Sequence, residues 1–129
     1  MISRLPIILF SIFLLISCSK DKKVIYESSK KVDPYFLYKE GMDSFTKNDY
    51  FYASKKFSEA EINFEVIELA AKSAIMSSYA LYGINFYTEA LENLNRYLKK
   101  YPADQNVMYA HYLMAIIYFE QISDEKKDI

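Results

Sequence analysis

Cys18 is the residue with the clearest potential for covalent chemistry, because it is the only cysteine among the 129 residues of this sequence. With no second cysteine, a disulfide within the chain is impossible. Cys18 closely follows an apolar run from Leu5 to Ile16, and a single positive charge, Arg4, precedes that run. A run of this length is too short to cross a membrane comfortably and is typical of a secretory signal. We therefore expect Cys18 near the start of an exported protein.

The residues Leu15-Ile16-Ser17-Cys18 resemble the bacterial lipobox, in which a small residue precedes the cysteine that receives a lipid. The resemblance implies that residues 1–17 are a signal peptide and that lipidated Cys18 attaches the mature protein to a membrane. An uncleaved amino-terminal anchor and an ordinary signal followed by a chance cysteine are the alternatives. Ser19, where an Asp would imply inner-membrane retention, favours the outer membrane. Residues 18–33 are mostly polar and predict a flexible tether.

Elsewhere the sequence offers little for catalysis. His111 is the only histidine, so without a partner for a shared metal ion we expect it to be packed or partly exposed. The acidic pairs Asp124-Glu125 and Glu59/Glu61 are expected to be solvated rather than to act as acid–base pairs. No Gly-rich phosphate loop, nucleophile elbow or metal-ligand spacing occurs. We therefore expect no enzyme, no cofactor and no metal.

The composition favours helices. Two Gly and three Pro are few for a sheet protein, which needs many tight turns. A hydrophobic content of 52% with 26% charged residues is ordinary for a globular domain. The net charge is −1, and Lys and Arg are scattered among Asp and Glu, so the basic surface of a nucleic-acid binder is missing. We predict an all-α domain with no nucleic-acid partner.

Five helices are predicted from periodicity and end signals, over residues 34–47, 50–63, 66–82, 87–101 and 106–121. Asp33-Pro34 is a typical start, with an accepting N-cap followed by a residue that needs no donor partner. Asp49 is expected to cap the second helix. Gly83 is expected to end the third helix, and Pro102 the fourth.

The fourth predicted helix repeats the pattern of the second. One face of the fourth carries Tyr87, Ala90, Leu94 and Tyr97. Four residues of the second helix have the same separations and precede them by 37 positions each: Tyr50, Ala53, Phe57 and Ala60. Small residues recur at the same distance in the other helices, as a close helix crossing requires: Gly41, Ser78 and Ala115. Such a period predicts stacked helix pairs, for which binding is the default function.

These patterns resemble the tetratricopeptide repeat and, more narrowly, the BamD family of outer-membrane β-barrel assembly lipoproteins. The segments that carry the resemblance are the lipobox, Tyr38-Lys39-Glu40-Gly41, Asn48-Asp49-Tyr50, Arg96-Tyr97-Leu98-Lys99-Lys100-Tyr101-Pro102 and Asn106-Val107-Met108-Tyr109-Ala110-His111-Tyr112-Leu113. The resemblance implies a tetratricopeptide-like α-solenoid over residues 34–129, with about two and a half repeats. Members of the family carry more repeats, so this chain resembles an amino-terminal half. An unpaired last helix would expose Leu113, Ile117 or their neighbours.

The resemblance also implies a function and partners. It implies a lipid-anchored adaptor on the periplasmic face of the outer membrane that helps to assemble and insert β-barrel proteins. Its partners would be a BamA-type barrel, other assembly lipoproteins and unfolded outer-membrane protein precursors. Two other functions stay open. One is a general tetratricopeptide lipoprotein that serves cell-wall or division proteins, and the other is a regulatory segment of an enzyme encoded in further sequence.

The first helix of each tetratricopeptide pair lines a groove, and large apolar or aromatic residues occupy the positions that would face it. The candidate groove residues are Tyr35, Tyr38, Met42, Phe45, Ile75, Tyr79, Tyr82, Tyr109, Tyr112, Ile116 and Phe119. Lys72 is the one charged residue in the same rows. Such a surface suits an extended peptide, since tyrosine offers a large contact area at low entropic cost. The alternative is that neighbouring repeats or further sequence cover these rows.

Overall fold

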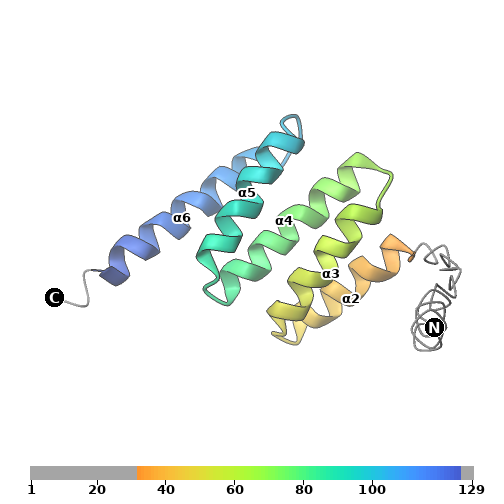
Figure 1. Ribbon diagram of the computed structural model, residues 1–129, viewed down its shortest axis with the longest axis horizontal. Coiled ribbons are helices and arrows are strands. Elements are labelled where there is room, and N and C mark those ends of the chain that lie inside the picture. The colour runs from red at the N-terminus through yellow and green to blue at the C-terminus, as the bar shows by residue number, and fades with distance from the viewer. Residues whose placement is uncertain (1–31, 126–129) are drawn as a thin grey trace, which may run out of the picture.

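The computed structural model describes residues 32–125, with side-chain environments given as far as Ile122. These residues form five α-helices and no strand: α2 (Pro34–Thr46), α3 (Tyr50–Asn63), α4 (Ile67–Gly83), α5 (Tyr87–Lys100) and α6 (Val107–Glu125). Consecutive helices pack side by side in chain order (Figure 1), and α4 also touches α6. The all-α prediction is therefore confirmed. The helices α2–α3 and α4–α5 form two pairs, and α6 takes the position of the first helix in a third pair. The predicted signal peptide and Cys18 lie outside the described residues.

The first two helices start as the sequence predicts. The side chain of Asp33 accepts a hydrogen bond from the backbone N–H of Tyr35 at 3.0 Å, and Pro34 lies in the first turn of α2. Asp49 accepts one from the N–H of Tyr52 at 3.2 Å. Each cap satisfies a donor that the helix cannot satisfy internally, and this fixes where the chain enters α2 and α3.

The turns within both helix pairs use asparagine in the left-handed conformation. Asn48 has φ 62° and Asn85 has φ 61°, and no glycine of the described chain has a positive φ. The helix α4 ends at Gly83 as predicted, and Asn85 supplies the left-handed residue of the turn that follows. The hydroxyls of the tyrosines two residues later, Tyr50 and Tyr87, lie 2.9 and 3.1 Å from the side-chain oxygens of Asn48 and Asn85. Asparagine tolerates this backbone conformation better than most residues, and here the hydroxyl contact holds it.

The predicted core faces of the second helices are confirmed. On α3 and α5 the fully buried residues are Ala53, Phe57, Ala60, Ala90, Leu94 and Tyr97. A Cβ atom added to Gly41 of α2 would lie 2.8 Å from the ring of Phe57, so this crossing requires glycine. Ser78 takes the equivalent buried position on α4.

One side of α6 packs against the rest of the fold and the other side is exposed. Leu113 and Ile117 are buried, so the exposure that we expected of them falls only on their neighbours. Ala115, the third small residue of the repeat, is exposed as well. The exposed large residues of the helix are Met108, Tyr109, Tyr112, Tyr118, Phe119 and Ile122. Among the described residues, α6 has no helix on its outer side.

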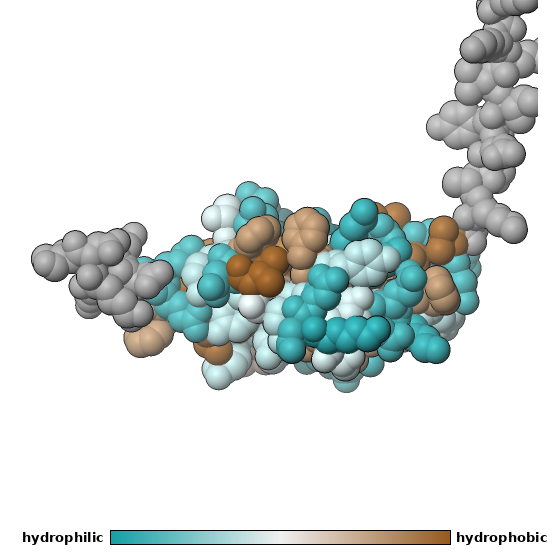
Figure 2. Space-filling model, turned by 90° about the horizontal axis from the view of Figure 1, so that it is seen from below, coloured by the Kyte–Doolittle hydropathy of each residue, from teal (hydrophilic) through white to brown (hydrophobic). Residues whose placement is uncertain are grey.

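Figure 2 views the molecule from the side on which the α2–α3 and α4–α5 turns lie in Figure 1. It shows a small hydrophobic patch surrounded by polar residues. The exposed Phe51 and Phe86 lie next to these turns, with ring centroids 6.4 Å apart.

Within residues 32–125, no helix is both long enough and apolar enough to cross a bilayer.

Candidate functional site

Three aromatic rings connect the first helices of the repeats. Phe45 of α2 stacks on Tyr79 of α4 with ring centroids 5.6 Å apart. Tyr79 meets Tyr109 of α6 edge to face at 6.4 Å. We call Phe45, Tyr79 and Tyr109 the aromatic ladder. It provides one ring from each first helix and runs across the face that these helices carry.

A second set of the predicted groove residues packs within its own helix pair. Tyr38 contacts Phe57 at 5.3 Å, and Tyr82 contacts Tyr87 at 6.2 Å. Phe45 belongs to both sets, since its ring also lies 5.0 Å from that of Tyr50. These side chains of the first helices therefore pack against rings of the second helices. The equivalent residues of α6 are Tyr112 and Phe119, which have no second helix over them among the described residues and are 62% and 73% exposed.

The remaining candidates differ in burial. Tyr35 is exposed, and its ring meets Phe64 edge to face at 5.1 Å. Met42 and Ile116 are half-buried. Ile75 is only 6% exposed and belongs to the core. Ile75 can therefore form only the floor of a binding surface.

A pocket of about 470 Å³ opens beside the ladder, between α4 and the start of α6. Its lining residues are Lys72, Ile75, Met76, Tyr79, Gln105, Asn106 and Tyr109. Burial raises the pKa of Tyr109, so its hydroxyl stays protonated and able to donate a hydrogen bond. The lining combines apolar side chains, two phenols, two amides and one cation, without a nucleophile beside a base. This chemistry suits the binding of a peptide.

A carboxylate links the carboxyl-terminal end of α4 to α5 and α6. Glu120 of α6 accepts hydrogen bonds from the hydroxyls of Tyr82 and Tyr87, both at 2.8 Å. The bond to Glu120, together with burial, raises the pKa of Tyr82 to about 12. This contact could not be predicted from helical periodicity, because its partners are more than thirty positions apart. The contact holds α6 in place beside the ladder.

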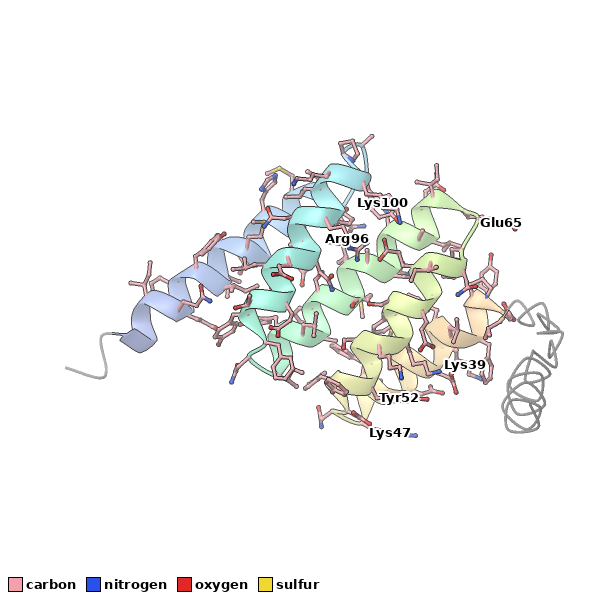
Figure 3. The ribbon with its side chains drawn as sticks, in the orientation of Figure 1. Lys39, Lys47, Tyr52, Glu65, Arg96 and Lys100 are labelled. Atoms are coloured by element: carbon pink, nitrogen blue, oxygen red, sulfur yellow. The ribbon has the colours of Figure 1, made fainter. Side chains whose placement is uncertain are left out.

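The prediction that Glu61 is solvated was wrong. Glu61 is 3% exposed and accepts two hydrogen bonds from Arg96, at 2.6 and 2.8 Å. Lys100 donates another at 3.0 Å, and the hydroxyl of Tyr101 a fourth at 2.9 Å. Arg96 and Lys100 lie one turn apart on α5 (Figure 3). This cluster joins the end of α3 to the end of α5 and so connects the two helix pairs.

Burial alone would raise the pKa of Glu61, but the hydrogen bonds from Arg96 and Lys100 outweigh it and lower this pKa below its usual value. The carboxylate is therefore charged at neutral pH. Nothing in the periodicity around Glu61 indicates a buried acid, since its partners lie 35 to 40 positions away. The only feature of the sequence that pointed to this cluster was the Arg96–Pro102 segment, on which the family resemblance partly rests.

No cluster of metal ligands is found within the described part of the chain. His111 is exposed on α6, in keeping with the expectation of a partly exposed side chain.

Comparison with known proteins places the chain in a family. Residues 30–129 match the family model YfiO, described as an outer membrane lipoprotein. The chain is 34% identical over 110 residues to the "Outer membrane protein assembly factor BamD" of Caulobacter vibrioides, covering 85% of this chain and 35% of that protein. It is 30% identical over 128 residues to the protein of the same name from Rickettsia prowazekii, covering 98% of this chain and 50% of that protein.

The chain thus spans between about a third and a half of the length of these curated relatives. No solved structure gives a significant match. The resemblance to BamD proteins that the sequence suggested is confirmed over most of this chain. Since the family model covers well over half of the residues, the chain belongs to the YfiO family of outer membrane lipoproteins.

Proposed function

We propose that this chain binds unfolded outer-membrane β-barrel precursors as extended segments, on the face carried by α2, α4 and α6, during their assembly. The observation that carries the proposal is the aromatic ladder, which crosses all three first helices without interruption. The relatives named as outer membrane protein assembly factors support the same role.

The spacing of the ladder suits an extended ligand. Its ring centroids lie 5.6 and 6.4 Å apart. In an extended chain, side chains on the same side recur about every 6.5 to 7 Å. Alternate side chains of a strand can therefore meet successive rings, and alternating apolar residues are the pattern of a half-buried strand. The tyrosine hydroxyls are available to pair with the peptide backbone.

Anchoring and partners complete the proposal. A lipid on Cys18 would hold the chain on the periplasmic face of the outer membrane, with residues 18–33 as a tether. Bound precursors would then pass to a BamA-type barrel with the help of other assembly lipoproteins. Binding and delivery, rather than catalysis, would be the contribution of this chain.

Site-specific crosslinking tests the binding face. A photoreactive phenylalanine analogue replaces Tyr79 in the full, lipid-modified chain, and the matched control carries it in place of Tyr52, which is exposed on α3. We expect the probe at position 79 to capture unfolded barrel precursors and the probe at position 52 not to do so. Equal capture at both positions, or capture of only unrelated proteins, would contradict the proposal.

A second experiment measures affinity. Tyr79→Ala should weaken binding of a strand-forming barrel peptide about tenfold, because aromatic anchors contribute on the order of 1–2 kcal/mol to such contacts. Tyr52→Ala removes a tyrosine from α3 instead and should leave the affinity unchanged. Titration of a labelled peptide, followed by fluorescence anisotropy, gives both values.

A further inference from the structure

Lys72 is the only charged residue that lines the pocket between α4 and α6. It is also the only charged residue among the groove rows that the sequence defines. The pocket is otherwise built from aromatic, aliphatic and amide side chains. A single cation in such surroundings favours a ligand that carries a negative charge.

No ion pair involves Lys72 among the described residues, whereas Lys56, Arg96 and Lys100 each pair with an acid. Lys56 pairs with Glu40 at 3.1 Å and with Glu59 at 3.2 Å. Arg96 and Lys100 both pair with Glu61. The ammonium of Lys72 instead lies 5.6 Å from the ring centroid of Tyr38. A cation–π contact positions the ammonium without the close ion pair that the other three cations make. Glu68, one turn earlier on α4, is the nearest acid in sequence on the same helix and forms no ion pair with it.

Asp104, the acid in the turn before α6, is already engaged. Asp104 accepts hydrogen bonds from the hydroxyl of Tyr97 and from the backbone and side chain of Asn106. These bonds commit its oxygens to the turn before α6. The amino-terminal end of α6, with its positive dipole end, lies on the same side of the pocket as Asn106. The engagement of Asp104 elsewhere and the positive end of the α6 dipole both favour an anionic group in the pocket.

We propose that the pocket binds an acidic side chain of an extended polypeptide segment, with its carboxylate at Lys72 and with apolar side chains of the same segment on Tyr79 and Tyr109. The inference rests on the proposed function, because it names the ligand chemistry of the same face. Charge complementarity carries it, since the face offers one unpaired cation between aromatic surfaces. A segment that alternates apolar side chains and carries Glu or Asp near one of them fits this arrangement.

The test compares two peptides that differ at one residue. Both are strand-forming, alternate apolar residues and have amidated carboxyl termini; one carries Glu at the central position and the other Gln. We expect the full chain to bind the Glu peptide about fivefold more tightly at low salt, as a partly exposed ion pair allows. The preference should shrink as salt screens the pair.

Variants identify the residue responsible. Lys72→Gln should abolish the preference and Lys72→Arg should retain it, while Lys47→Gln, a change at an exposed lysine after α2, should leave it intact. Lys72 is exposed, so circular dichroism should show unchanged folding of its variants. A preference that survives in Lys72→Gln would overturn the assignment.

The remaining outcomes separate this inference from the function on which it rests. Equal affinity of the unmodified chain for both peptides would overturn the inference and leave the proposed function standing. Failure to bind either peptide would count against the proposed function itself. A third peptide, with Gln at the centre and a free carboxyl terminus, covers the other source of a carboxylate. If it alone binds more tightly, the pocket recognises a chain end and the inference is wrong.

Discussion

Glu61 joins the two helix pairs through four hydrogen bonds to residues of α5 and its end. Removing a carboxylate from water carries a large desolvation cost, which is offset only when donors surround the group. Arg96 and Lys100 do so while their own side chains remain 43% and 50% exposed. The acid is therefore buried, whereas the cations stay partly hydrated. This arrangement keeps the cluster stable without burying a complete ion pair.

Glu61→Gln should lower the free energy of unfolding by about 1–3 kcal/mol, because the substitution removes charge-assisted hydrogen bonds. The glutamine amide also cannot accept hydrogen bonds from all the donors that surround Glu61. The matched control is Glu92→Gln, which changes an exposed acid on α5 and should have an effect within about 0.5 kcal/mol. Urea unfolding, followed by circular dichroism at neutral pH, measures both. Indistinguishable midpoints for the two variants would show that Glu61 carries no special stability.

The stability from Glu61 should depend on pH in a defined direction. Its pKa is lower in the folded chain than the ordinary value of 4.5, so the unfolded chain takes up a proton first as the pH falls. The contribution is complete above the ordinary pKa and disappears as the pH falls through the folded pKa. The gap in unfolding free energy between the original chain and Glu61→Gln should therefore narrow as the pH falls from neutral through the ordinary pKa of 4.5 and below it. A gap that stays constant over this range would contradict the pKa shift.

Residues such as Glu61 mark the limit of what periodicity predicts. The neighbouring core residue Ala60 was predicted correctly, because apolar side chains at helical spacing indicate a buried face. A buried acid gives no such pattern, and its stability depends on donors that only the folded arrangement brings near. Ile75 shows a related limit of prediction from periodicity. It is buried, although the residues at the equivalent positions are half-buried in α2 (Tyr38) and exposed in α6 (Tyr112).

At the scale of the helices, the crossing of α2 and α3 depends on the absence of a side chain. Gly41 allows the ring of Phe57 to pack directly on the backbone of α2. Gly83 is different, because a Cβ atom there would lie 3.4 Å from the ring of Tyr50, which is an ordinary contact. The two glycines therefore have different roles, although both lie in first helices.

Gly41→Ala should destabilise the chain by about 1–3 kcal/mol, because the added methyl group forces Phe57 or α2 to move within a packed core. Gly83→Ala should be neutral or stabilising by up to about 1 kcal/mol, since alanine favours a helix over glycine and no clash opposes it. Thermal and urea unfolding of both variants give the comparison. Effects of the same sign and size would contradict the role assigned to the crossing.

Most bounds of the helices were predictable because capping and periodicity are local, but α6 ends at Glu125, four residues beyond its predicted end. Asp33 and Asp49 cap as predicted, and the start of α4 was missed by one residue because Val66 offers no side-chain cap. The left-handed turn residue was harder to assign, since both Gly83 and Asn85 tolerate that conformation. The hydroxyl of Tyr87 favours Asn85, and this contact forms only in the turn itself.

At the scale of the whole molecule, we propose that a lipid on Cys18 attaches the helical domain to the membrane. Cys18→Ser should move the protein from the membrane fraction to the soluble fraction, because the variant lacks the thiol that would carry the proposed lipid. Fractionation of cells that express each form measures the change. The control is Ser19→Ala, which keeps the cysteine. Retention of Cys18→Ser in the membrane fraction would show that another segment or a partner holds the chain there.

The aromatic ladder also has an optical consequence. The sequence contains 13 Tyr and no Trp, so tyrosine dominates the intrinsic fluorescence of the chain. The ring contacts at Tyr79 and Tyr109 place two emitters side by side, beside the pocket. A peptide that carries a single Trp would accept excitation energy from these tyrosines when it binds there. Its sensitised emission would report occupancy directly, in an unlabelled chain, with no substitution in the protein.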